Sequence, residues 1–140
     1  MTGERSAAAD QSAVAGPLSP EDAKIVTLAR SARLRAHTPR AGLAAAEGAA
    51  VRDTDGRTYA AATVENGDPA LTTSALRAAV AAAASSGARS FEAAAVVSEA
   101  LPVADGIPVV ADLAVLAEFG SGVPVLLAGP DGVVRERVAT

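Results

Sequence analysis

The pattern of apolar and polar positions divides the chain into helical and extended segments. Ile25, Leu28 and Ala32 recur at helical spacing after Ser19-Pro20, a capping serine followed by a proline suited to the first helical turn. This pattern predicts a first helix over about residues 20–36. Two further helices are predicted over about residues 73–86, stopped by Gly87, and over residues 108–119.

Short β-prone runs separated by turn residues predict five strands. Phe91–Ser98 is nearly continuously apolar, as expected for the centre of a sheet that is covered on both faces. A turn at residues 53–56, with Gly56 supplying positive φ, predicts that the first two strands pair antiparallel. Pro124 indicates the start of a strand or an edge strand. The predicted strands are residues 48–52, 57–64, 91–98, 123–128 and 133–138.

The order of these elements is helix, strand, strand, helix, strand, helix, strand, strand. It predicts an α/β fold, a three-layer α/β/α sandwich with a mixed sheet of five strands. Residues 1–18 are small, polar and unpatterned, so we expect a flexible tail followed by one domain over residues 19–140. Residues 101–106 are expected to form a loop, and residues 41–46 a loop or a short helical turn.

Composition narrows the classes of function. The net charge is −4 and the pI about 4.9, so the chain lacks the basic surface of a nucleic-acid-binding protein. It has no cysteine, no signal-peptide pattern and no apolar run long enough to cross a membrane, and we expect a cytoplasmic protein. The alanine excess, with eleven arginines to one lysine, is typical of a GC-rich bacterial genome.

Residues 63–77, TVENGDPALTTSALR, are predicted to run from a strand through a turn into a helix N-terminus. Polar residues delivered to such a turn are a common way to build a small-molecule site. This stretch is therefore the leading candidate for a functional site.

Five segments resemble the short cytidine deaminases, in the same order and at nearly the same spacing. Residues 48–51 resemble the family's G-A-A-L strand, and residues 55–59 its D-G-x-x-Y turn. Residues 64–66 match the core of N-V-E-N, residues 71–77 lie where the family has L-T-x-C-A-E-R, and residues 115–120 match V-L-A-E-F-G. The resemblance covers roughly 115 residues and implies the deaminase fold.

In that family a zinc ion, held by one Cys or His and two Cys, activates water, and a glutamate shuttles protons during attack on cytosine. The resemblance places Ser74 at the first ligand, Leu76 at the glutamate, and Val109 and Asp112 at the two cysteines. A tetrahedral zinc site needs three protein ligands, and leucine carries no proton. We therefore expect no bound zinc or other cofactor, no catalytic residues and no deaminase chemistry.

The resemblance implies a partial ligand site and an assembly. The family's first Asn of N-V-E-N is Thr63 here, while Glu65 and Asn66 are retained. These three residues are candidates for weak binding of a nucleoside-like ligand. A homo-oligomer, dimer or tetramer, is also expected, because the family is oligomeric.

The residues themselves leave alternatives open. His37 is a helix-end or loop histidine rather than a metal ligand or base, and Ser74 a helix cap rather than a nucleophile. Asp112 and Asp105 are a candidate pair for a hard cation such as Mg²⁺. The favoured alternative is that Asp112 is an acid in the first turn of the third helix, where it stabilises the helix. Glu65 either binds a ligand hydroxyl or makes a structural hydrogen bond.

The favoured function is a catalytically inactive deaminase-like binding or assembly module. The alternative is an enzyme: an active cytidine or nucleoside deaminase, or another hydrolase, with a non-standard site such as one using Glu65 and Asp112. No general acid–base pair is evident in the sequence, which favours the first interpretation.

Overall fold

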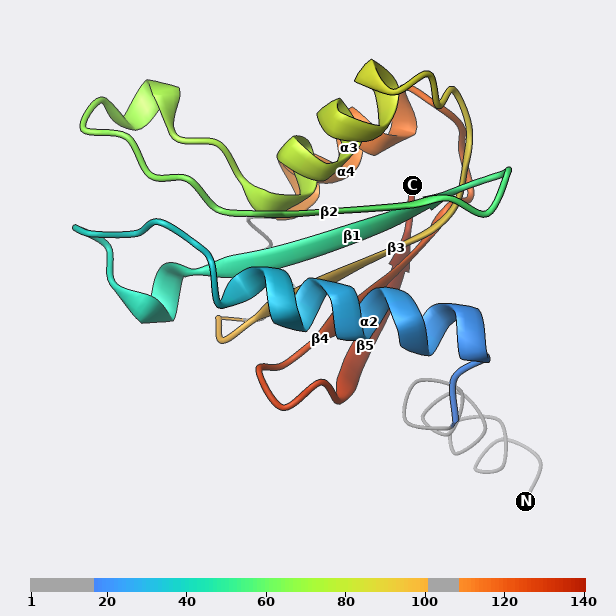
Figure 1. Cartoon of the computed structure of the whole chain (residues 1–140), viewed down its shortest axis with the longest axis horizontal. Helices are drawn as coiled ribbons and strands as arrows, with labels where there is room; N and C mark the ends of the chain where they lie inside the picture. Colours follow the sequence, from blue (N-terminus) through green and yellow to red (C-terminus); the bar gives the residue numbers. More distant parts are fainter. Residues whose placement is uncertain (1–16, 101–108) are drawn as a thin grey trace.

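A five-stranded mixed sheet lies between helices on both of its faces (Figure 1). The computed structural model describes residues 17–100 and 109–140. The strand order is β2-β1-β3-β4-β5, and the predicted three-layer fold with five strands is confirmed. The strands are β1 (Glu47–Asp53), β2 (Thr58–Ala62), β3 (Phe91–Ser98), β4 (Pro124–Ala128) and β5 (Val134–Ala139).

The pairing of the strands follows from the turns and connections. β1 pairs antiparallel with β2 through the turn that contains Gly56 (φ 87°), as predicted, and antiparallel with β3 on its other side. β3 pairs parallel with β4 across the α4 connection, and β4 pairs antiparallel with β5. The apolar strand β3 is the central strand, and Pro124 is the first residue of β4; both predictions are confirmed.

Helix α2 (Pro20–Arg33) covers one face of the sheet (Figure 1). The hydroxyl of Ser19 accepts a hydrogen bond from the N–H of Asp22 at 3.1 Å, so the predicted cap forms. Ile25 and Ala29 are fully buried against the sheet, in a cluster with residues of β1, β3, β4 and β5. Leu18 packs against the same cluster.

Helices α3 (Ala75–Ser85) and α4 (Val109–Ala117) lie next to each other on the opposite face (Figure 1). Between them and the sheet is a second apolar cluster, built mainly from alanine, valine and leucine. Its aromatic members Phe91 and Phe119 meet edge to face with ring centroids 5.5 Å apart. Two 3₁₀ turns, η1 (Leu43–Ala45) and η2 (Pro69–Leu71), lie in the loops that follow α2 and β2.

Several predicted helix ends are wrong by a few residues. α2 ends at Arg33 rather than at residue 36, because residues 34–36 donate to carbonyls three positions back and tighten into a turn. α4 ends at Ala117 rather than at residue 119 for the same reason. α3 begins at Ala75 rather than at residue 73, since Thr73 pairs with Val64 in an isolated β-bridge and Ser74 is the cap.

The strands also differ from the prediction at their ends. β2 stops at Ala62 rather than at residue 64, because Val64 does not pair with β1 and forms isolated bridges with His37 and Thr73 instead. β1 begins one residue earlier than predicted, at Glu47, and ends one residue later, at Asp53. β4 and β5 are shifted by one residue at one or both ends.

Part of the prediction falls outside the described residues: the tail up to residue 16, the 101–106 loop with Asp105, and the predicted helix start at Pro108. Within the described ranges, each helix is too short or too polar to traverse a bilayer.

Candidate functional site

Polar side chains from the sheet and from two helix N-termini gather on the α3/α4 side of the sheet. Side chains alternate along a strand, so Glu47 shares the face of Ala49 and Val51, which pack in the cluster beneath α3. Ser98 at the end of β3 is the register partner of Glu47 and lies on the same face. Ser74 caps α3 and Asp112 lies in the first turn of α4.

Each carboxyl of this group lies beside a serine hydroxyl. Ser98 favours the charged form of Glu47, and Ser74 favours the charged form of Asp112. Both Ser98 and Asp112 are buried, at 2% and 9% exposure. Ser74 also accepts a hydrogen bond from the N–H of Arg77 at 3.4 Å, so the predicted capping role is present. The described residues contain no buried polar side-chain atom without a hydrogen-bond partner.

The pKa values of the two carboxyls in this cluster are both raised. Burial raises the pKa of Glu47, the bond from Ser98 opposes that rise, and the nearby charge of Asp112 adds to it. Burial likewise raises the pKa of Asp112, against the bond from Ser74 and the positive charge of Arg77.

Leu76 lies two residues beyond the Ser74 cap and faces the apolar cluster. It is 1% exposed and packs in the same cluster as Ala49 and Val51. A side chain in this position contributes to the core and cannot accept or donate a proton. Val109 is the first residue of α4, three positions before Asp112.

Thr63 is placed in the connection between β2 and the following loop. Its hydroxyl accepts from the N–H of Glu47 at 3.0 Å and donates to the Glu47 carbonyl at 3.4 Å. The residue is 8% exposed. Its hydroxyl therefore extends the pairing of β1 past the end of β2.

Glu65 binds the loop that follows α2. Its Oε1 accepts from the backbone N–H groups of Arg40 and Ala41, both at 3.0 Å, and its Oε2 accepts from Arg40 Nη1 at 3.2 Å. The bond from Ala41 lowers the pKa of Glu65 against the cost of desolvation, and the bonds and charge of Arg40 lower it further. The carboxylate is charged and has structural partners in this loop.

Asn66 stabilises the turn that leads to η2. Its side-chain oxygen accepts from the N–H of Asp68 at 2.9 Å, and its own N–H donates to Thr72 Oγ1 at 3.0 Å. Beside it is a cavity of about 450 Å³ to which Glu65 and Asn66 both contribute. Its lining residues are Arg40, Ala41, Glu65, Asn66, Gly67, Pro69 and Thr72. The structure thus brings two of the three predicted ligand-binding residues to one cavity and places Thr63 outside its lining.

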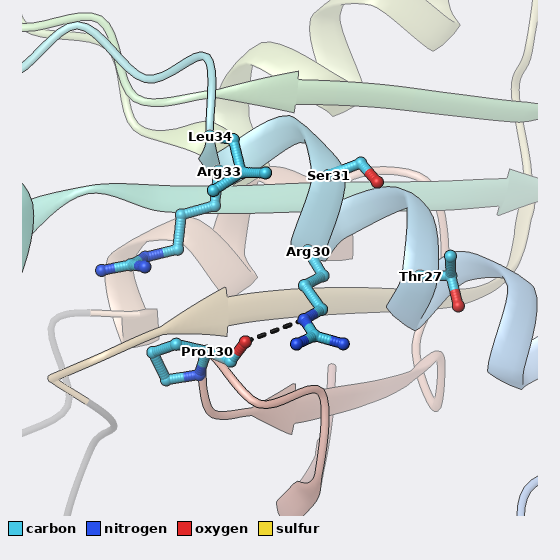
Figure 2. Close-up of a pocket in the computed structure, with 6 residues that line it drawn as sticks. All are labelled: Thr27, Arg30, Ser31, Arg33, Leu34 and Pro130. Carbon is cyan, nitrogen blue, oxygen red and sulfur yellow. Dashed lines mark hydrogen bonds between the residues drawn. The ribbon is translucent and has the colours of Figure 1, made fainter.

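A cavity of about 510 Å³ lies on the other face of the sheet, beside α2 (Figure 2). Arg30 crosses it and donates from Nε to the carbonyl of Pro130 in the β4–β5 turn at 2.9 Å. Arg33 points away towards the loop after α2, where it donates to the carbonyls of Leu43 and Ala46. None of the predicted site residues lines this cavity.

Sequence reasoning missed Glu47 and Ser98. The available signal was Glu47, an acid on the strand face that points into the core, which directly precedes the small apolar residues 48–51. His37 is exposed, and its backbone pairs with Thr63 and Glu65, as expected for a loop histidine. No group of three or more His, Cys, Asp or Glu side chains in the described ranges is placed to hold a metal ion.

The five-stranded mixed sheet with helices on both faces is the fold of cytidine deaminase-like α/β proteins. A profile described as Cytidine deaminase-like matches residues 18–132, and the chain belongs to this family. A comparison with curated protein sequences finds no significant match.

Two solved structures are similar over most of their length. The cytidine deaminase from Burkholderia pseudomallei is 32% identical, with a TM-score of 0.70, covering 84% of this chain and 89% of that one. The cytidine deaminase from Mycobacterium tuberculosis is 30% identical, with a TM-score of 0.62, covering 80% and 87%. The sequence-based assignment to the cytidine deaminase-like family is confirmed.

Proposed function

We propose that this chain is a catalytically inactive cytidine deaminase-like protein that serves as a binding or assembly module. One observation carries the proposal. Ser74 and Asp112, at two of the positions where the family places metal ligands, lie beside each other, while Leu76 lies in the apolar core. The groups at the reaction centre thus make internal contacts.

The donor set at these positions does not fit zinc. Zinc in this family needs three ligands from nitrogen or sulfur donors, held tetrahedrally. The chain offers a serine hydroxyl, a valine and one carboxyl at Ser74, Val109 and Asp112, and it contains no cysteine.

The retained function in this proposal is weak binding of a nucleoside-like molecule at the cavity beside Glu65 and Asn66. The relatives described above are cytidine deaminases, which makes a nucleoside the first ligand to test. The cavity volume of about 450 Å³ is within the range of small-molecule sites. Assembly into a homo-oligomer, dimer or tetramer, is the companion proposal and does not depend on ligand binding.

Incubation with cytidine and deoxycytidine tests the loss of activity. We expect no loss of cytosine absorbance, with the Burkholderia pseudomallei enzyme as positive control. Protein purified without chelators should contain substoichiometric zinc. Turnover or stoichiometric zinc would support the alternative, an active deaminase or other hydrolase with a non-standard site.

A thermal-shift panel of nucleosides separates binding from pure assembly. A ligand that binds the native state must raise the melting temperature. If millimolar nucleoside does not raise the melting temperature, only the assembly function remains. Light scattering of the purified chain then tests assembly directly.

A further inference from the structure

Both oxygens of the Glu65 carboxylate are occupied by one neighbouring loop. Oε1 accepts the two backbone N–H groups of Arg40 and Ala41, and Oε2 accepts Arg40 Nη1 at 3.2 Å. The carboxylate is 11% exposed, and it borders the cavity together with Arg40. A ligand hydroxyl that approaches Glu65 from the cavity therefore meets an oxygen already bonded to a guanidinium.

The two kinds of bond on Glu65 differ in how easily they break. The bonds to Oε1 come from backbone groups, and breaking them would move the loop. The bond to Oε2 comes from a long side chain that is 63% exposed, and exposed ion pairs contribute little net stability. Only the guanidinium can leave without rearranging the backbone.

The surroundings of Arg40 give the guanidinium a defined place over the cavity. A Cβ built on Gly67 would lie 3.2 Å from Arg40 Nη2, so the side chain rests against this glycine. Gly67 belongs to the same cavity lining. The guanidinium therefore lies between the two loops that border the cavity.

We propose that Arg40 is an autoinhibitory side chain: its guanidinium bonds Oε2 of Glu65 at the border of the cavity and competes there with the hydroxyl of a ligand. This inference rests on the proposed nucleoside binding at the same cavity. Removing the guanidinium frees Oε2 while the two backbone bonds keep Oε1 and the loop in place. Screening by salt weakens the same ion pair, so it should also raise the affinity for the ligand.

The test compares wild type, Arg40→Ala and the control Arg35→Ala by calorimetric titration with cytidine and with free cytosine. Arg35 is an exposed arginine whose guanidinium bonds only the carbonyl of Ser31 among the contacts of the described residues. We expect Arg40→Ala to bind cytidine roughly two- to fivefold tighter, the range that an exposed ion pair supports. Cytosine lacks hydroxyls, so its affinity should be the same in all three proteins.

Ionic strength provides a second readout on the same proteins. Raising it from about 0.01 M to about 1 M shortens the screening length from about 30 Å to about 3 Å. Cytidine affinity should rise with salt in wild type and in Arg35→Ala, and stay flat in Arg40→Ala.

Equal cytidine affinity in wild type and Arg40→Ala would overturn autoinhibition and leave the proposed binding function standing. Binding by Arg40→Ala alone would support both. An absence of cytidine binding in all three proteins would overturn both, and weaker binding by Arg40→Ala would show that Arg40 is a ligand contact.

Discussion

Glu47 and Ser98 face each other across β1 and β3 as direct register partners, and the serine favours the charged form of the glutamate carboxyl. The pair stands at the end of the sheet on the side covered by α3 and α4. Through Asp112 and Ser74 the same polar cluster reaches the N-termini of both helices. The charge of Asp112 raises the pKa of Glu47, so the polar groups at the sheet end and at the helix N-termini lie close enough to influence one another.

The first prediction concerns the pH dependence of this cluster. The pKa of Glu47 is raised in the folded state, so its protonated form is favoured by folding. Its stabilising contribution is complete below the unfolded pKa of about 4.3 and is lost as pH rises through the folded value. Glu47→Gln imitates the neutral carboxyl and should be more stable than wild type at pH 8, by on the order of 1 kcal/mol.

Urea denaturation of both proteins at about pH 5 and pH 8 checks this prediction. Other carboxyls, such as Glu65, change the stability of both proteins equally, so the difference between them isolates Glu47. At the lower pH the two should be nearly equal. A glutamine variant that is less stable than wild type at both pH values would contradict a neutral Glu47.

The second prediction concerns Leu76. Leu76→Glu restores the residue type that the family uses for proton transfer, but it places a carboxylate in a core position that is 1% exposed. We expect a loss of roughly 3 kcal/mol or more and no turnover of cytidine. Leu76→Met, which nearly conserves volume, should cost less than about 1.5 kcal/mol. Full stability of the glutamate variant, or any deamination by it, would contradict this account.

Much of the fold follows from the sequence because it depends on local patterns. The apolar run of β3 indicated cover on both faces, Pro124 indicated the start of a strand or an edge strand, and Gly56 permitted the tight turn. The helix ends were harder to predict. Residues 34–36 have good helix propensity, yet they tighten into i→i−3 bonds where the chain turns towards β1.

The candidate site could be predicted only in part. Ser74 and Leu76 are two residues apart in one short motif, so their difference from the family residues was visible in the sequence. The contact of Glu47 with Ser98 joins residues far apart in the chain, and its existence depends on strand register. Likewise, no local pattern indicated that Glu65 is bound by the backbone of Arg40. Hydrogen bonds between distant segments leave no periodic trace in the sequence.

The third prediction concerns the packing of α2 on β1. Gly48 lies directly beneath the helix, and a Cβ at this position would collide with the backbone carbonyl oxygen of Ala29. Backbone atoms cannot move aside as a side chain does, so Gly48→Ala should shift α2 and cost about 1 to 3 kcal/mol. Gly67→Ala is a matched control, because its Cβ meets only the movable guanidinium of Arg40. Thermal denaturation of both variants compares them, and equal losses would argue against close packing at Gly48.

The last prediction concerns the hydrogen bonds by which Glu65 holds the loop after α2. Its pKa is lowered, first by the bond from Ala41, so its contribution is present above the unfolded pKa of about 4.3 and is lost as pH falls through the folded value. Glu65→Ala removes the acceptor of the Arg40 and Ala41 N–H groups, and their hydrogen exchange should accelerate at neutral pH. Arg40→Ala keeps both backbone bonds and should leave the exchange of the Ala41 amide nearly unchanged. In wild type, the same acceleration, after correction for intrinsic exchange rates, should appear below about pH 4. Protection that persists in Glu65→Ala would mean that the loop is held by other contacts, and Glu65 would then be free for a ligand.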